Sequence, residues 1–262
     1  MAFGGRVVRW AVGWSHDGIR QGACSGGWGL AWAVMGERAR RRRMYTRGRI
    51  PGGGDLCRAL VEVGIGDPRI LEAFREVPRR EFVPCEQRSR AYEDVPLPIP
   101  HGQVTTQPSL TAKMVEALAL RGTERVLEVG TGLGFQTAVL AKLAREVWSV
   151  ERWQALAETA HANLAGCGVQ NARVVVGDGT RGLPRRAPFD AIVVAAAFPR
   201  VPLPLTEQLV PGGRLVQPLG PGGREDVALH VKEGTVLRHS RLVTTAHFVP
   251  LVGEHAFAED HG

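Results

Sequence analysis

The stretch that decides the fold of this chain is Val126–Glu151, which reads VLEVGTGLGFQTAVLAKLAREVWSVE. The β-branched and aliphatic residues of Arg125–Glu128 predict a buried strand. A turn rich in glycine follows at once, with Gly130, Gly132 and Gly134. Apolar residues at helical spacing then predict a helix over Phe135–Ala144. Trp148–Val150 predicts the neighbouring parallel strand, so the stretch as a whole predicts a strand–helix–strand unit.

The turn between the strand and the helix has the features of a ligand site. Glycine lets the backbone turn sharply and lets a ligand approach the main chain with no Cβ in the way. The start of the helix behind it offers unpaired N–H groups. Glu151 ends the second strand, roughly 20 residues past the glycines, where an acid accepts hydrogen bonds from both hydroxyls of a ribose. The pattern therefore predicts a nucleoside ligand.

The spacing of the glycines separates two classes of nucleoside. Dinucleotide-binding folds carry GxGxxG and aim a helix N-terminus at a pyrophosphate. This chain has GxGxG, preceded by the acid Glu128, whose charge repels a phosphate and attracts an ammonium or sulfonium group. The pattern favours S-adenosylmethionine over NAD and leaves a nucleotide-dependent dehydrogenase as a distant alternative. The plainer interpretation, a tight turn and nothing more, is weaker because a strand, a helix and an acid surround the glycines.

The composition indicates one large domain with an appendage. The 262 residues are 44% hydrophobic and include no long apolar run, which argues against disorder and against a membrane span. The cysteines are scattered and form no CxxC pair: Cys24, Cys57, Cys85 and Cys167. We therefore expect no zinc site, no disulfide framework and a location in the reducing cytoplasm.

The net charge of +7 comes from the N-terminal segment. Residues 1–49 hold ten Lys and Arg against two Asp and Glu, a net charge of +8, while the remainder is nearly neutral at −1. Because a nucleic-acid enzyme usually carries its basic surface on the folded domain, we expect no nucleic-acid partner for the core. We interpret residues 1–49 as a disordered basic extension, with Met35 or Met44 as alternative starts. The arginine run Arg38–Arg43 leaves open a nucleic-acid or membrane-surface patch.

Residues 50–109 are predicted to form a cap of helices and loops. Two short helices are expected, over Leu56–Val63 and Pro68–Val77. His101–Ser109 reads HGQVTTQPS and predicts a polar loop that leads into a helix over Leu110–Leu120. This loop is placed to close over a bound ligand. Alternatively it only caps the helix, with Ser109 or Thr106 as the capping residue.

Strands and helices continue to alternate after Glu151. The predicted elements are a helix over Gln154–Leu164, strands over Arg173–Val176 and Phe189–Ala195, a helix over Pro204–Leu209 stopped by Pro211-Gly212-Gly213, a strand over Arg214–Leu219, and an antiparallel hairpin over Asp226–Lys232 and Val236–Val243. We therefore expect an α/β fold over residues 110–253, with a tail at 254–262. Its core is a Rossmann-like, doubly wound, mostly parallel sheet with a C-terminal antiparallel hairpin and an N-terminal helical cap. Asp178, at the end of the third strand, is placed to accept from an adenine amino group or to make a turn.

From about Asp67 to Gly253 the chain resembles one family, protein-L-isoaspartate O-methyltransferase, which has the class I methyltransferase fold. The matching stretches are VPRREFVP (Val77–Pro84), AYEDVPLPI (Ala91–Ile99), GQVTTQPSLTAKM (Gly102–Met114), LEVGTGLGFQTAVLA (Leu127–Ala141), VGDGTRGLP (Val176–Pro184), FDAIVV (Phe189–Val194), LVPGGRLVQPLG (Leu209–Gly220) and FVPLVG (Phe248–Gly253). The glycine motif alone indicates only some methyltransferase. The loop HGQVTTQP and the segment FVPLVG are far more specific, because a generic methyltransferase has no reason to share them.

The resemblance implies methyl transfer from S-adenosylmethionine to the free carboxylate of L-isoaspartyl residues in damaged proteins. The products are S-adenosylhomocysteine and a methyl ester, which collapses to a succinimide. The resemblance further implies isoaspartyl-containing proteins and peptides as partners, no metal, no membrane association and a monomeric enzyme. Two alternatives stay open: a methyltransferase of the same fold that acts on RNA or a small molecule, and a non-catalytic relative that binds the cofactor.

The resemblance also assigns roles to residues. Thr106, where the family usually has Ser, is the catalytic residue, and its hydroxyl orients the substrate carboxylate. The implied cofactor-binding residues are Gln103, Val104, Thr105, Thr106, Glu128, Gly130, Thr131, Gly132, Gly134, Glu151, Asp178 and Gly179. The implied peptide-binding residues are Thr106, Phe248, Val249, Pro250 and Val252. Three further positions depart from the family pattern: Val104, Leu133 and Ala195. We expect the larger side chain of Leu133 to reshape the methionine end of the cofactor site.

Overall fold

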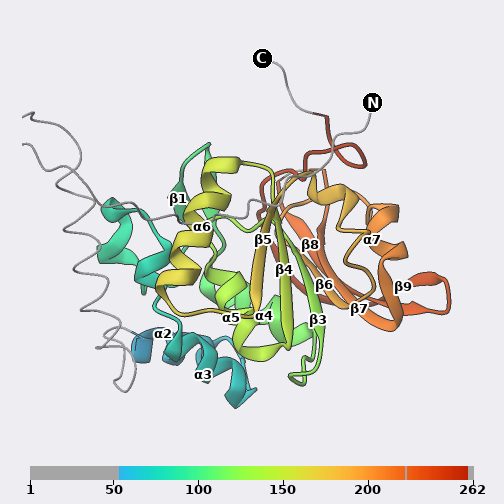
Figure 1. The fold of residues 1–262 in the computed structure, drawn as a ribbon. Helices are drawn as coiled ribbons and strands as arrows, with labels where there is room; N and C mark the ends of the chain where they lie inside the picture. Colours follow the sequence, from blue (N-terminus) through green and yellow to red (C-terminus); the bar gives the residue numbers. More distant parts are fainter. Residues whose placement is uncertain (1–52, 222, 259–262) are drawn as a thin grey trace, which may run out of the picture. The chain divides into compact units, whose positions relative to one another are not determined.

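The computed structural model describes residues 53–221 and 223–258, so the predictions for residues 1–49 lie outside the described part (Figure 1). A seven-stranded sheet with the order β5-β4-β3-β6-β7-β8-β9 forms the centre of this part. Its strands are β3 (Arg125–Val129), β4 (Glu146–Glu151), β5 (Ala172–Val176), β6 (Phe189–Val194), β7 (Leu209–Leu219), β8 (Glu225–Glu233) and β9 (Val236–Ala246). The first five are parallel to one another, and β8 and β9 run antiparallel as the predicted hairpin.

The sheet is doubly wound, as predicted. From β3 the chain moves outward to β4 and β5, and then returns to the other side of β3 to form β6 and β7. The direction of winding therefore reverses between β3 and β6. In open α/β sheets this switch point leaves a crevice at the carboxyl ends of the strands, where ligands bind.

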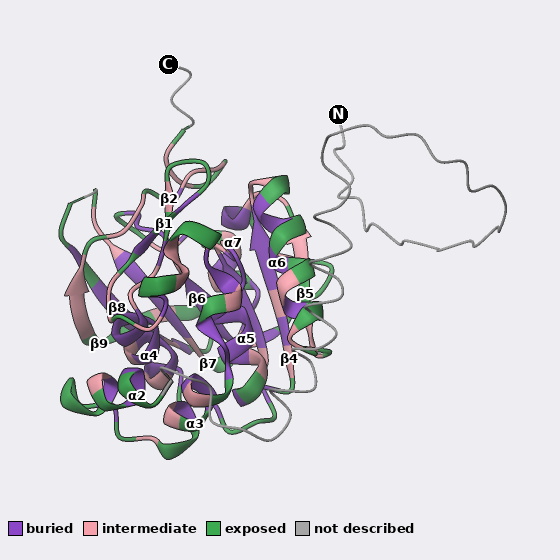
Figure 2. Cartoon of the chain, turned by 90° about the vertical axis from the view of Figure 1, so that its left-hand side faces the viewer, coloured by how far each residue is buried: buried purple, intermediate pink, exposed green. Residues whose placement is uncertain are grey.

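Successive residues of a strand point to opposite faces, and each face of this sheet is covered. On one face Val126 and Val147 pack with the helices α2 (Gly53–Glu62), α3 (Pro68–Glu76), α4 (Pro108–Ala117), α5 (Phe135–Leu143) and α6 (Gln154–Gly166). On the other face Leu127 and Ile192 pack with the short helix α7 (Leu203–Glu207) and a C-terminal segment around Leu251. Figure 2 shows the strands as a buried layer beneath helices whose outer sides are exposed.

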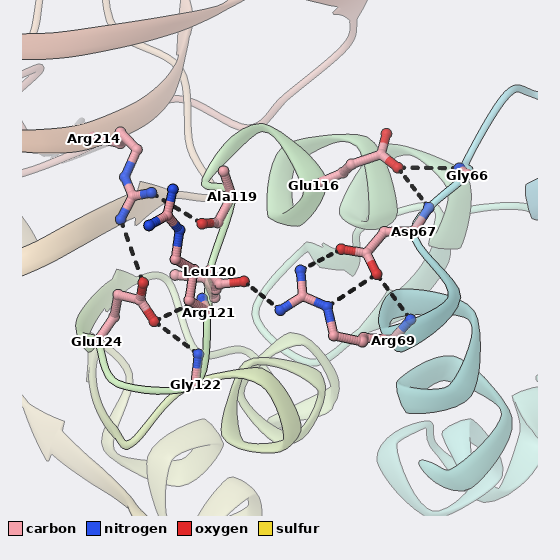
Figure 3. A network of polar contacts seen from close by, with 10 residues as sticks. All are labelled: Gly66, Asp67, Arg69, Glu116, Ala119, Leu120, Arg121, Gly122, Glu124 and Arg214. Atoms are coloured by element: carbon pink, nitrogen blue, oxygen red, sulfur yellow. Dashed lines mark hydrogen bonds and ion pairs between the residues drawn. The ribbon is translucent and has the colours of Figure 1, made fainter.

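The helices α2 and α3 are tied to the sheet domain by a polar network (Figure 3). The carboxylate of Glu116, in α4, accepts from the backbone N–H groups of Gly66 and Asp67, at 3.1 and 3.2 Å. Asp67 caps α3 and pairs with Arg69, which donates to the carbonyl of Leu120 at 2.8 Å. The N-terminal cap formed by α2 and α3 thus contacts the sheet domain at α4 and at the connection between α4 and β3.

Two short 3₁₀ helices, Arg79–Phe82 and Cys85–Arg90, connect α3 to a small hairpin. This hairpin corrects the prediction of a loop over His101–Ser109. Its strands are β1 (Leu97–Ile99) and β2 (Gln103–Thr105), which pair antiparallel. The turn is made by His101 and Gly102, both with positive φ, of 62° and 65°. That combination suits a tight hairpin turn, but the sequence signal is weak because His stands where Asn or Asp is usual.

Two further local predictions are wrong. Neither Ser109 nor Thr106 caps α4: the cap position is Gln107, with Pro108 first in the helix, and the carboxylate of Asp94 accepts from the N–H of Ser109 at 2.8 Å. The stretch Pro211-Gly212-Gly213 does not separate a helix from a strand, because it lies inside β7. There the pairing of β6 with β7 shifts register between Phe189 and Ala191, which accommodates the extra residues.

No helix within 53–221 and 223–258 combines the length and the apolar character that crossing a membrane requires.

Candidate active site

A cavity of about 280 Å³ lies at the switch point, at the carboxyl ends of β3, β4 and β6. Most of the residues that line it come from five parts of the sequence: the hairpin segment Gly102–Thr106, the glycine loop Val129–Leu133, the connection from β4 to α6 with Glu151–Trp153, the end of β6 with Ala195 and Ala196, and the C-terminal segment Val249–Val252. Parts of the chain that are up to about 150 residues apart in sequence thus meet around one space, as expected for the crevice of a doubly wound sheet.

The glycine loop turns beneath the cavity. Gly130 and Gly132 line it, and both have positive φ, of 94° and 55°, where a side chain would be strained. Gly134 does not line it and instead lies against α6, because a Cβ there would sit 3.4 Å from Ala160 Cβ. Thr131 lines the cavity, while its hydroxyl lies 2.5 Å from the hydroxyl of Ser149. The loop therefore presents mainly its backbone to the cavity.

Glu151 stands at the rim of the cavity, as its place at the end of β4 predicts. One carboxylate oxygen accepts from the N–H of Gly132 at 2.8 Å, and the other accepts from the N–H of Trp153 at 3.0 Å. The side chain is thereby held in one orientation between the glycine loop and the start of α6. Each oxygen keeps a further lone pair for a donor in the cavity.

Glu128 lies beneath the glycine loop, fully buried, and is not part of the cavity wall. Its Oε2 accepts from the hydroxyls of Thr137 and Ser149, at 2.5 and 2.6 Å, while its Oε1 has no hydrogen-bond partner among the described residues. Burial raises the pKa of Glu128 to about 7, although the two hydroxyls act against the rise. Any action of Glu128 on a ligand is therefore electrostatic and passes through the loop.

Leu133 lines the cavity, and the expected effect of its size on the methionine end of the cofactor site stays a prediction. Its side chain is buried in a small apolar cluster with Ile99 of β1 and Leu156 of α6, and Trp153 packs against this cluster. Leu133 thus joins the hairpin, the glycine loop and α6. The ring of Trp153 also stacks on His101 at the hairpin turn, with ring centres 4.3 Å apart.

The hairpin and the segment that follows it form another part of the cavity wall. Gln103, Val104, Thr105 and Thr106 all line the cavity. The hydroxyl of Thr105 accepts from Arg79 and from the N–H of Leu97, at 3.0 and 3.2 Å. Thr106, half-buried, follows directly. The structure therefore brings all four predicted residues of this segment to the predicted site.

The C-terminal segment closes the cavity on the β6 side. The N–H of Ala197 donates to the carbonyl of Val249 at 2.8 Å, and the N–H of Leu251 donates to the carbonyl of Ala197 at 2.7 Å. These bonds place Val249, Pro250 and Val252 on the cavity wall, together with Leu251. Phe248 does not line the cavity; its N–H donates to the buried carboxylate of Glu225 at 2.9 Å.

Gly179 lines the cavity beyond β5, and Asp178 does not. The carboxylate of Asp178 accepts from the N–H and the hydroxyl of Thr180, at 2.9 and 2.7 Å, and from the N–H of Glu254, at 2.8 Å. Asp178 thus makes a turn and holds the C-terminal segment in this structure. Its assignment to adenine stays a prediction.

Comparison with known proteins gives the cavity its chemical context. Residues 54–256 match the family described as protein-L-isoaspartate(D-aspartate) O-methyltransferase, which is more than half of the chain. The chain belongs to this family. A relative from Roseiflexus castenholzii, named protein-L-isoaspartate O-methyltransferase, is 48% identical over 203 residues, covering 77% of this chain and 92% of its own length. The resemblance inferred from the sequence motifs is confirmed.

Solved structures give the same answer. One protein-L-isoaspartate O-methyltransferase superposes with a TM-score of 0.69 at 31% identity, covering 78% of this chain and 67% of that one. A protein described as a putative member from Plasmodium falciparum, solved with S-adenosyl-L-homocysteine, superposes with a TM-score of 0.66 at 21% identity, covering 79% and 99%. The second likeness confirms the class I methyltransferase fold.

The cavity fits the S-adenosyl ligand of an isoaspartate methyltransferase. Three residues that line the cavity have side-chain polar atoms that are buried without a hydrogen bond among the described residues: Thr111 Oγ1, Trp153 Nε1, and Oε1 and Nε2 of Gln136. A bound ligand with several hydroxyl, amino and carboxylate groups supplies such partners. A Cβ on Gly179 would overlap Val129 Cγ1, so glycine there keeps the backbone close to the cavity. The residue set therefore fits the group.

Several residues that line the cavity were not predicted from the sequence: Phe82, Ile99, Thr111, Gln136, Arg152, Trp153 and Leu156. Thr111 lies five residues past Thr106, Gln136 two residues past Gly134, and Arg152 directly after Glu151, so closeness in sequence to predicted site residues was the signal that could have found them. Within 53–221 and 223–258, no group of three His, Cys, Asp or Glu residues is arranged to hold a metal ion.

Proposed function

We propose that this chain transfers a methyl group from S-adenosylmethionine to the free carboxylate of L-isoaspartyl residues in damaged proteins. One observation carries the proposal: the two most family-specific stretches, HGQVTTQP and FVPLVG, each contribute residues to the wall of the cavity formed by the glycine loop and Glu151, namely Gly102–Thr106 and Val249–Val252. A site for S-adenosylmethionine alone requires neither stretch. Their position supports a second ligand, the isoaspartyl peptide, beside the first.

The reaction does not require a general acid or a general base from the protein. When bound, S-adenosylmethionine supplies an electrophilic methyl group on a positively charged sulfur, which departs as a neutral thioether. A carboxylate oxygen of the isoaspartyl residue forms the new O–C bond as the S–C bond breaks. Because the carboxylate is already ionised at pH 7, no proton moves. The protein's part is to align the two groups and to exclude water from charges that cancel in the transition state.

Thr106 is the residue proposed to touch the substrate carboxylate. It lies on the cavity wall between the hairpin and α4, and its hydroxyl can donate one hydrogen bond. Such a bond fixes which carboxylate oxygen faces the methyl group. The added methyl of Thr, compared with the Ser usual in the family, stiffens the side chain without removing the donor.

The cofactor is proposed to lie along the glycine loop. Gly130 and Gly132 would hold its methionine end, the carboxylate of Glu151 its ribose hydroxyls, and the backbone of Gly179 its adenine. The hairpin segment Gln103–Thr106 would cover it. The C-terminal residues Val249, Pro250 and Val252 would hold the backbone of the peptide, which suits an enzyme that accepts many flanking sequences.

The test is methyl transfer from labelled S-adenosylmethionine to a synthetic isoaspartyl peptide, with the normal aspartyl peptide as control. We expect a base-labile methyl ester on the isoaspartyl peptide alone. Thr106→Val keeps the shape and removes the hydroxyl, and is expected to lower kcat about 10- to 100-fold. Thr106→Ser keeps the hydroxyl and is expected to stay within a few-fold of the wild type.

The other outcomes are equally informative. Methyl incorporation into RNA or a metabolite, and none into the isoaspartyl peptide, would overturn the proposed substrate. Binding of S-adenosylmethionine with no methylated product would indicate a non-catalytic relative.

We propose in addition a cytoplasmic monomer without a nucleic-acid or membrane partner for its core. The near-neutral charge after residue 49 supports this, as do the free cysteines of the described part, Cys57, Cys85 and Cys167. The division into a basic extension at 1–49, a cap at 50–109, a methyltransferase domain at 110–253 and a tail at 254–262 is part of the same proposal.

A further inference from the structure

Arg79 is fully buried, although it begins a run of three charged residues, Arg79-Arg80-Glu81. Its guanidinium lies over the ring of Phe135, 5.7 Å from the ring centre. Burial lowers the pKa of Arg79 to about 10, and the nearby acids Asp94 and Glu93 act against this fall. The side chain therefore stays charged at neutral pH. A buried charge is costly unless hydrogen bonds satisfy it.

The hydrogen bonds of Arg79 all go to the segment that leads into the cavity wall. One terminal nitrogen donates to the carbonyls of Ala91 and Glu93, at 3.0 and 2.9 Å. The other donates to the carbonyl of Val95 and to the hydroxyl of Thr105, at 2.9 and 3.0 Å. The planar guanidinium thus fixes the backbone at 91–95 and the end of β2 in one arrangement.

Asp94 lies within the backbone that Arg79 holds, and it fixes the other side of Thr106. One carboxylate oxygen accepts from the side-chain amide of Gln107 at 2.9 Å, and the other accepts from the N–H of Ser109 at 2.8 Å. Thr106 therefore stands between Thr105, which Arg79 holds, and Gln107, which Asp94 holds. Neither Arg79 nor Asp94 lines the cavity.

We propose that Arg79 and Asp94 are positioning residues for methyl transfer, which fix the segment Thr105–Gln107 from both sides and thereby hold the Thr106 hydroxyl on the cavity wall. The proposal rests on the proposed function, because it assumes that Thr106 meets the substrate carboxylate. Its structural part, the fixing of the segment, does not depend on any activity.

The first experiment follows amide hydrogen exchange of residues 103–109 in the full chain. We expect faster exchange in Asp94→Ala and in Arg79→Lys. The second variant keeps the positive charge but loses the planar guanidinium group that donates to several acceptors at once. A matched control is Lys232→Met: Lys232 is also a buried cation that donates to backbone carbonyls, those of Thr206, Glu207 and Leu209, and it does not line the cavity. It is expected to lower Tm without changing exchange at 103–109. Unchanged exchange in Asp94→Ala, which is only half-buried and should fold, would overturn the proposal whether or not the protein is an enzyme.

The second experiment is a double-mutant cycle on kcat/KM for the isoaspartyl peptide. Asp94→Ala is expected to lower kcat/KM about 100-fold in the wild type, as misplacing a reacting group by about 1 Å does. In the Thr106→Val background the same change should cost about twofold or less, because its effect passes through the hydroxyl. Asp94→Asn, which keeps an acceptor for Ser109 and lets the Gln107 amide turn over, should restore most of the activity. Equal losses in both backgrounds would overturn the positioning role. No methyl transfer by the wild type would instead overturn the proposed function, while the exchange result would stand.

Discussion

The carboxylate of Glu151, at the end of β4, accepts a hydrogen bond from the backbone N–H of Gly132, 19 residues earlier in the glycine loop that follows β3, at 2.8 Å. This bond joins the two strand ends that flank the cavity. It also fixes the orientation of the Glu151 side chain before a ligand binds, so that binding costs less conformational entropy.

We expect Glu151→Gln to raise the Kd for S-adenosylhomocysteine about 10- to 100-fold, because Gln retains one acceptor oxygen where two are used. Titration calorimetry measures the change. Glu158→Gln makes the same substitution at an exposed position of α6 and should leave Kd unchanged. Equal affinity of Glu151→Gln and the wild type would contradict the ribose assignment.

We expect the buried carboxyl group of Glu128 to make the free energy of unfolding depend on pH. Burial raises its pKa from 4.5 to about 7, so between these values the folded state keeps a proton that the unfolded state has released. The free energy of unfolding therefore falls as the pH rises through this window, by about 3 kcal/mol from this group alone. Urea unfolding at pH 5 and pH 8 should show a smaller fall for Glu128→Gln than for the wild type. Identical pH profiles would mean that Glu128 is not protonated in the fold.

We expect that position 179 in the cavity wall cannot take a side chain without a steric clash. Its Cβ would overlap Val129 Cγ1, a side chain at the end of β3 that has little room to move. We expect Gly179→Ala to cost about 1–3 kcal/mol of stability and to weaken binding of S-adenosylhomocysteine. Gly166→Ala, at the end of α6 with no atom within 4 Å of the new Cβ, serves as the control and should be near neutral. Unfolding in urea and calorimetric titration of both variants provide the comparison.

We expect Leu133 to stabilise the fold rather than to obstruct the cofactor site. Because it is buried with Ile99 and Leu156, we expect Leu133→Ala to cost about 2–5 kcal/mol of stability. Val61→Ala, at an exposed position of α2, should cost about 0.5 kcal/mol or less. A stability unchanged by Leu133→Ala, together with tighter cofactor binding, would show instead that the leucine obstructs the site.

Much of the fold could be predicted from the sequence, because the deciding signals are local. The apolar run of β3, the glycines that need positive φ and the acid that ends β4 lie within 26 residues and act through their own backbone geometry. The alternation that follows predicts a doubly wound sheet, since a parallel strand needs a crossover. The polar loop that contains Gln103–Thr106 was expected from the sequence to close over a ligand, whereas the cavity wall at Val249, Pro250 and Val252 followed from family resemblance alone.

What the tertiary structure decided are contacts between residues far apart in the chain. Nothing around Arg79 in sequence indicates that it is buried, because its partners lie 12 to 26 residues away. Asp94 replaces Ser109 as the acceptor at the start of α4 because folding brings the 91–95 backbone there. Asp178 accepts from Glu254, 76 residues on, which the turn-forming character of an Asp between glycines could not reveal. By itself the sequence determined most strands and helices of the sheet domain and the edge of the sheet where the cavity lies, since these follow from backbone geometry; the β1–β2 hairpin and the start of β7 did not follow from it. Which side chains hold the site in place was decided by packing, because a buried polar group takes whichever partner the fold brings within reach.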